Sequence, residues 1–270
     1  MTRYVRTALA GAAVLAAAMT AHAADSRLVS IKTPRGVNQA FILVTPAKPS
    51  ASLIMFAGGS GGLGLRSATS MRWGATNFVV RTRDMFAAHG FAVAVVDAPG
   101  DRHKGMNAIF RMSAAHAGDI AAIAAYLKKQ ANVPVWLVGT SMGTFSAAGG
   151  AIAAGDIDGL VLTSTITSAN PRWHIAKTYP DGVASMALSR ITVPTLIVAH
   201  RKDGCEESPA SGAPKLKARL IKATKVEIVV LDGGKPPKGK PCEALAQHGY
   251  FGIEDKAVGA IANFIKANTK

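Results

Sequence analysis

The chain has 270 residues and carries 31 Lys and Arg residues against 16 Asp and Glu residues, a formal net charge of +15. This length fits one large α/β domain with a substantial core. The basic charge favours anionic surroundings, but the cationic residues form no stripe with interleaved aromatic residues, so nucleic acid is not expected as a partner.

The first 23 residues have the pattern of a secretory signal peptide. Arg3 and Arg6 precede an apolar run rich in Ala and Leu, and Ala21-His22-Ala23 supplies the small residues of a cleavage site. The apolar run is shorter than the roughly 20 residues of a membrane-spanning helix. We therefore expect cleavage after Ala23, a periplasmic or secreted location, and a single domain over residues 24–270.

From Ser26 onward, short apolar segments alternate with amphipathic ones. This pattern predicts a mostly parallel central sheet with helices on both faces. The expected strands are an antiparallel hairpin at 28–33 and 40–45, followed by 52–56, 91–96, 134–138, 159–162, 195–199 and 226–231. The expected helices are 81–89, 113–129, 144–154 and a final helix that presents Val258, Ile261 and Ile265 on one face. Residues 164–192 give no clear pattern, and we expect at most a short cap there.

The segment Gly139-Thr140-Ser141-Met142-Gly143 matches G-x-S-x-G between a predicted strand and a predicted helix. A sharp strand-to-helix turn of this kind exposes the serine hydroxyl, and glycines on either side remove the Cβ atoms that would clash. The motif and its context predict that Ser141 is a nucleophile.

A serine hydroxyl becomes a good nucleophile only when a base takes its proton. His248 follows the last predicted strand and precedes the final helix, where a loop residue reaches the carboxyl edge of the sheet, and we select it as the base. His103 and His174 lie in predicted loops and stay as alternatives. His89 and His116 fall on predicted helices, where a surface or packing role explains them better.

The base in turn needs a carboxylate that orients the imidazole and stabilises its cation. Asp203 follows the strand at 195–199 within four residues, and we select it as this acid. Glu206 and Glu207 lie close by, and Asp232 follows the next strand, so these three acids stay as alternatives.

The chain order Ser141, Asp203, His248, with the element that precedes each, resembles the α/β-hydrolase superfamily over nearly the whole chain after the signal peptide. The resemblance implies an α/β-hydrolase fold with an eight-stranded type of sheet, acyl-enzyme chemistry, and no metal or other cofactor. Ala57 and Thr140 replace histidines that many esterases and lipases carry at these positions, which argues against a lipase.

The resemblance also implies two backbone donors that stabilise an oxyanion. One is the N–H of Met142. The other lies in the glycine-rich loop after Phe56, where Gly59 is the first choice and Ser60 the second. Residues 59–64 of this loop also match the dinucleotide pattern G-x-G-x-x-G, but no clear helix follows and no acid stands at the required spacing, so nucleotide binding ranks below the oxyanion role.

Cys205 and Cys242 are the two cysteines of the chain. An exported protein meets oxidising conditions, so we expect a disulfide between them, and two cysteines are too few for a structural zinc site. The bridge would join the loop of Asp203 to the loop of His248. It could hold the geometry of these two residues, or it could stabilise the fold alone.

Together these features predict an exported serine hydrolase that cleaves an ester or similar activated acyl bond of a small-molecule or lipid-like substrate. An anionic envelope surface is a further candidate partner because the chain is so basic. The alternative is a non-catalytic envelope module that binds anionic ligands on the same fold.

Overall fold

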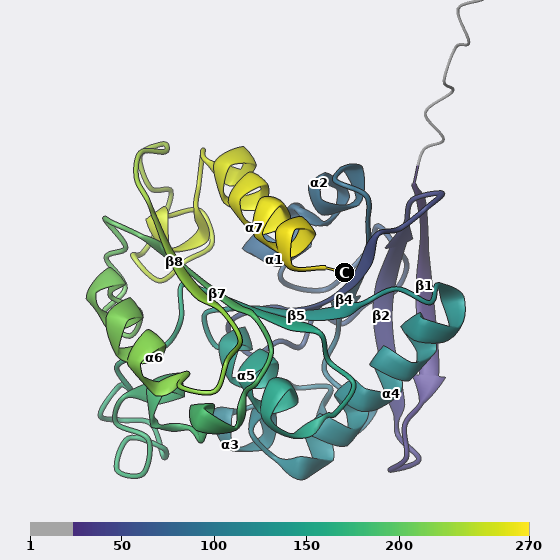
Figure 1. Cartoon of the computed structure of the whole chain (residues 1–270), viewed down its shortest axis with the longest axis horizontal. Helices are drawn as coiled ribbons and strands as arrows, with labels where there is room; N and C mark the ends of the chain where they lie inside the picture. The colour runs from purple at the N-terminus through teal and green to yellow at the C-terminus, as the bar shows by residue number, and fades with distance from the viewer. Residues whose placement is uncertain (1–23, 270) are drawn as a thin grey trace, which may run out of the picture.

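The computed structural model describes residues 24–269, so the expected signal peptide lies outside the described residues. In this part of the chain no helix is long and apolar enough to cross a membrane. One eight-stranded sheet has the order β1-β2-β4-β3-β5-β6-β7-β8 (Figure 1). The strands are β1 (Asp25–Lys32), β2 (Asn38–Thr45), β3 (Ala51–Phe56), β4 (Phe91–Val96), β5 (Val135–Thr140), β6 (Gly159–Thr163), β7 (Thr195–His200) and β8 (Val226–Leu231).

The sheet begins with the predicted antiparallel hairpin, in which β1 pairs with β2. Strand β2 also runs antiparallel to β4, and every later pairing, from β4 to β8, is parallel. The five strands β3 to β7 are buried along their whole length, because helices cover both of their faces. The prediction of a mostly parallel sheet is confirmed.

Helices form a layer on each face of the sheet (Figure 1). One layer holds α1 (Phe78–Arg81), α2 (Arg83–Ala88) and α7 (Glu254–Asn268), and the other holds α3 (Ala108–Arg111), α4 (Ala114–Gln130), α5 (Gly143–Ala153) and α6 (Ala213–Arg219). Successive residues of β5 show the period of two: Leu137 packs into one core, and Trp136 and Val138 pack into the other.

The helix predicted at 81–89 is two short helices, α1 and α2, which begin earlier and meet at Thr82. The Thr82 hydroxyl donates to the carbonyl oxygen of Phe78 at 2.7 Å, and its backbone leaves the helical region. A threonine that bonds back to its own helix in this way bends the chain, which explains the break. The second helix ends at Ala88, and Gly90, whose φ is +90°, follows its C-cap.

The segment that lacks a sequence pattern, residues 164–192, packs into the domain. Its apolar side chains Ile166, Ile175, Val183 and Leu188 are buried in the same core as α4 and α5. Short helical turns at Gly182–Ser185 and Leu188–Arg190 carry two of them. Because the segment reaches the core from irregular backbone, its apolar residues follow neither the helical nor the strand period.

Candidate active site

Ser141 occupies a sharp turn between β5 and α5, with a positive φ of 52°. A Cβ atom on Gly143 would overlap the carbonyl oxygen of Phe56, and one on Gly139 would lie 2.5 Å from the carbonyl oxygen of Gly143. No side chain fits at either position, so both glycines of the motif are required for the turn. A non-glycine residue in this backbone region is strained, and such strain is concentrated at functional sites.

Asp203 and His248, from two distant loops, are in contact. Nδ1 of His248 lies 2.9 Å from Oδ2 of Asp203, and the two side chains are 5% and 1% exposed. The other carboxylate oxygen of Asp203 accepts a hydrogen bond from the backbone N–H of Cys205 at 2.9 Å. Nε2 of His248 is buried and has no hydrogen-bond partner in the described part of the chain. The carboxylate therefore holds one side of the imidazole and leaves the other nitrogen available.

Ser208 is a third member of this cluster that the sequence did not indicate. Its buried hydroxyl lies 3.0 Å from Oδ2 of Asp203 and 2.9 Å from Nδ1 of His248. A hydroxyl that donates to the carboxylate can accept from an N–H at the same time. Both neighbours thus favour the tautomer with the proton on Nδ1, which leaves Nε2 as a proton acceptor.

The loop of His248 is tied to the sheet by Tyr250 and Ser164. The buried Tyr250 hydroxyl donates to the carbonyl oxygen of Val198 at 2.9 Å and accepts from the N–H of Ser164 at 3.0 Å. The Ser164 hydroxyl donates to the carbonyl oxygen of His248 at 2.7 Å. Burial raises the pKa of Tyr250, so the phenol stays neutral. Three of the four non-glycine residues with positive φ in the described part of the chain, Ser141, Ser164 and Tyr250, therefore belong to the site or its support.

Ser141 and His248 line one cavity of about 590 Å³ at the carboxyl edge of the sheet. Within residues 24–269 no hydrogen bond joins their side chains. Catalytic hydrogen bonds are often loose without substrate and tighten when it binds. Asp203 lies behind the imidazole, so the structure brings all three selected residues to this place.

Of the three residues selected as oxyanion donors, Met142 and Gly59 lie beside Ser141. Gly59 lines the cavity, and Met142 begins the turn of α5 directly after Ser141. Among the described residues, the N–H groups of Met142 and Gly59 donate to no protein acceptor. The N–H of Ser60 also donates to no protein acceptor in this part of the chain, but Ser60 does not line the cavity. This arrangement favours Gly59 over Ser60.

The loop after β3 is held from behind by Arg111, a fully buried arginine. Its guanidinium donates to the carbonyl oxygens of Ala57 at 3.4 Å and Gly59 at 3.2 Å, and to the Ser146 hydroxyl at 2.9 Å. In the described part of the chain no carboxylate pairs with it. Burial lowers its pKa to about 10, so it stays cationic at neutral pH. A buried charge of this kind needs its hydrogen bonds, and these fix the loop that carries Gly59.

Replacement of Arg111 with methionine should lower kcat about 10- to 100-fold, because a loop that moves by even 1 Å presents its donors poorly. Steady-state kinetics and the melting temperature together check this expectation. A folded variant with the kcat of the wild type would show that the guanidinium does not position the loop.

The glycine-rich loop does not have the surroundings of a dinucleotide site. Residues 65–77 contain no helix, although the pattern requires one directly after the glycines. The carboxylate of Asp97 instead accepts the backbone N–H groups of Leu63 at 2.7 Å, Gly64 at 3.2 Å and Leu65 at 2.9 Å. The carboxylate already accepts from the N–H groups of residues 63–65 that a phosphate would need, so this part of the loop serves the fold.

The other sequence candidates for base and acid lie elsewhere. His103 and His174 are exposed, and His174 lines a separate, mostly apolar recess beyond Met142. Glu206 is exposed, and Asp232 pairs with Arg201 on the surface at 3.1 Å. None of these four candidates lines the cavity of Ser141.

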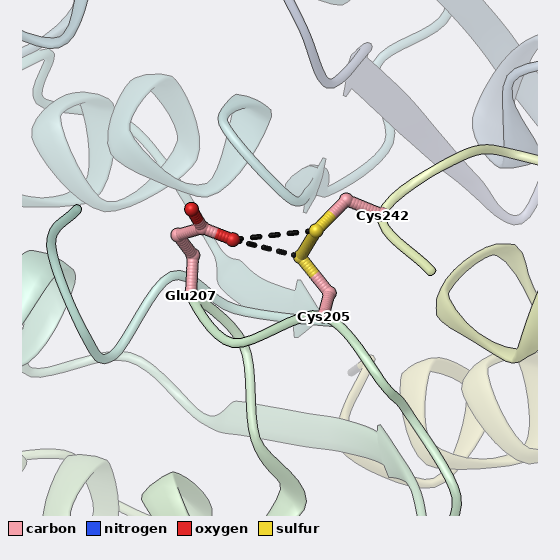
Figure 2. Close-up of side chains that lie close together, drawn as sticks. All are labelled: Cys205, Glu207 and Cys242. Carbon is pink, nitrogen blue, oxygen red and sulfur yellow. Dashed lines mark hydrogen bonds between the residues drawn. A yellow bond between two sulfur atoms is a disulfide. The ribbon is translucent and has the colours of Figure 1, made fainter. Parts of the chain in front are cut away.

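The predicted disulfide joins Cys205 and Cys242 (Figure 2). Oε2 of Glu207, another alternative for the acid, lies 3.2 Å from the sulfur of Cys205 and 3.3 Å from that of Cys242. The three groups are near enough to surround a metal ion, but sulfurs that are bonded to each other are not thiolate ligands. The bridge therefore links the loop of Asp203 to the wall of the cavity, which Cys242 lines.

Comparisons with known proteins agree with this fold. Residues 75–205, which include Ser141 and Asp203, match the model of a family described as serine aminopeptidase, S33. An esterase from Pyrococcus furiosus is 16% identical with a TM-score of 0.63, over 92% of each chain. A dienelactone hydrolase from Anabaena variabilis is 15% identical with a TM-score of 0.62, over 92% of this chain and 100% of its own.

A serine hydrolase without a lid from Xanthomonas campestris is 15% identical with a TM-score of 0.57, over 90% of this chain and 94% of its own. No curated protein sequence matches this chain. The sheet order, the strand-to-helix turn at Ser141 and these similarities place the chain in the α/β-hydrolase superfamily. The functional class that they support is a hydrolase.

Proposed function

We propose that this chain is a serine hydrolase that cleaves an ester or a similar activated acyl bond through an acyl-enzyme intermediate. The observation that carries the proposal is that Ser141 and His248 line the same cavity. Asp203 contacts Nδ1 of the imidazole, on the side away from Nε2. Neighbours named as esterases support an ester as the substrate.

In the proposed mechanism, Nε2 of His248 takes the proton of Ser141 as the hydroxyl oxygen attacks the acyl carbon. The N–H groups of Met142 and Gly59 stabilise the oxyanion that forms. His248 then gives its proton to the leaving group, which departs and leaves the acyl group on Ser141. A water molecule, activated by the same imidazole, releases the acid and restores the serine.

We also propose that the chain is exported and acts in the periplasm or outside the cell. The signal-peptide pattern of residues 1–23 supports export, and the disulfide fits an oxidising compartment. The net charge of +15 makes an anionic envelope surface a fitting neighbour.

A fluorophosphonate probe tests the proposed nucleophile directly. We expect the folded, oxidised protein to be labelled and Ser141→Ala to lose both the label and the hydrolysis of p-nitrophenyl acetate, because the probe reacts only with an activated serine. Ser211→Ala, which removes an exposed hydroxyl in a surface turn, is the matched control and should be labelled like the wild type. Labelling that survives in Ser141→Ala, or an unlabelled wild type, would overturn the proposal.

A further inference from the structure

Asn77 occupies the N-cap position of α1 but does not cap the helix. Asparagine is favoured at this position because its side-chain oxygen accepts a hydrogen bond from an N–H of the first turn. The Asn77 side chain makes no such bond. The backbone carbonyl oxygen of Asn77 accepts from the N–H groups of Val80 at 3.0 Å and Arg81 at 2.9 Å instead. The side chain is thus free for another role.

The side chain of Asn77 faces the nucleophile. Asn77 lines the same cavity as Ser141 and His248. A Cβ atom placed on Gly58 would lie 3.5 Å from Nδ2 of Asn77 and 2.9 Å from Cβ of Ser141. The amide and the nucleophile therefore border the same small space, which Gly58 keeps open, directly beside Gly59 and its candidate oxyanion donor.

Neither polar atom of the Asn77 amide has a protein partner in the described part of the chain. Oδ1 is buried and accepts no hydrogen bond, and Nδ2 donates none. Buried side-chain polar atoms are almost always paired, so an unpaired amide in a cavity needs an explanation. An asparagine at an N-cap position that does not cap its helix departs from the usual preference, and such departures are expected at functional sites.

We propose that Asn77 is a third oxyanion donor of this site and that its Nδ2 donates to the acyl oxygen as that oxygen gains charge. The inference rests on the proposed function, because the acceptor is the oxyanion that forms when Ser141 attacks. An amide NH₂ group is a donor that a charged oxygen attracts more strongly than a neutral carbonyl does, so its contribution is made mostly in the transition state.

The test compares Asn77→Ala and Asn77→Asp with the wild type on p-nitrophenyl acetate. Loss of one oxyanion donor should lower kcat about 10²- to 10³-fold with little change in KM. Aspartate has nearly the same size and shape as asparagine, so Asn77→Asp keeps the packing of this side chain while it removes the donor. Its kcat should fall at least as far as that of Asn77→Ala, because a carboxylate repels the oxyanion.

Ser113→Ala is the control for a merely structural effect. Ser113 caps α4 through a hydrogen bond that its hydroxyl accepts from the N–H of His116 at 3.2 Å, so its loss should lower the melting temperature and leave kcat unchanged. If the wild type hydrolyses the ester and both Asn77 variants keep kcat within threefold, or raise KM alone, the role of Asn77 is overturned while that of Ser141 stands. A wild type that is neither labelled nor active overturns both.

Discussion

Asp203→Asn should lower kcat about 10⁴-fold while the protein stays folded. The carboxylate accepts from Nδ1 of His248 and so keeps the proton of the neutral imidazole on that nitrogen. An amide at this position can donate to Nδ1, which would move the proton to Nε2 and leave no base for Ser141. Steady-state kinetics on p-nitrophenyl acetate and the melting temperature measure the two effects separately.

Asp232→Asn is the matched control for this prediction. Asp232 follows the next strand of the sheet, is exposed, and pairs with Arg201 at the surface, so its neutralisation should leave kcat unchanged. Ser208→Ala should have a smaller effect than Asp203→Asn, because the carboxylate still holds Nδ1. A kcat of Asp203→Asn within tenfold of the wild type would show that another group orients the imidazole.

The fold and the meeting of distant residues could be predicted because both follow from strong local patterns. The strands before Ser141 and Asp203 are continuous apolar runs, and the carboxyl ends of parallel strands lie along one edge of a sheet. A residue that follows such a strand therefore comes near the others, whatever the separation along the chain. The contact of Asp203 with His248 agrees with this reasoning, and the catalytic roles of the three residues stay a prediction.

The residues that surround the site could not be predicted, because residues of these types in these sequence positions usually have another role. An arginine is rarely buried, so no pattern in the chain placed Arg111 behind the loop of Gly59. Asn77 precedes a helix and is therefore expected to be a cap. Ser208 follows Asp203 in an irregular loop that has no period. Only the packing of the loops against one another brings these side chains to the site.

The disulfide should contribute to both stability and catalysis. Its removal in the double variant Cys205→Ala/Cys242→Ala opens a loop with a sequence separation of 37 residues. The chain-entropy model gives a loss of about 4 kcal/mol in the free energy of unfolding for a loop of this length. Chemical denaturation of the oxidised wild type and the variant measures this loss.

The catalytic part of this prediction follows from the position of the bridge. The N–H of Cys205 donates to the carboxylate of Asp203, and Cys242 lies in the wall of the cavity that His248 lines. Without the bridge both loops can shift, and a shift of about 1 Å can cost as much as 10²-fold in rate. We therefore expect kcat to fall at a temperature where the variant is still folded, and a reductant should lower kcat in the wild type but not in the double variant. If reduction lowers the stability and leaves kcat unchanged, the bridge stabilises the fold alone, because Asp203 and His248 then keep their contact without it.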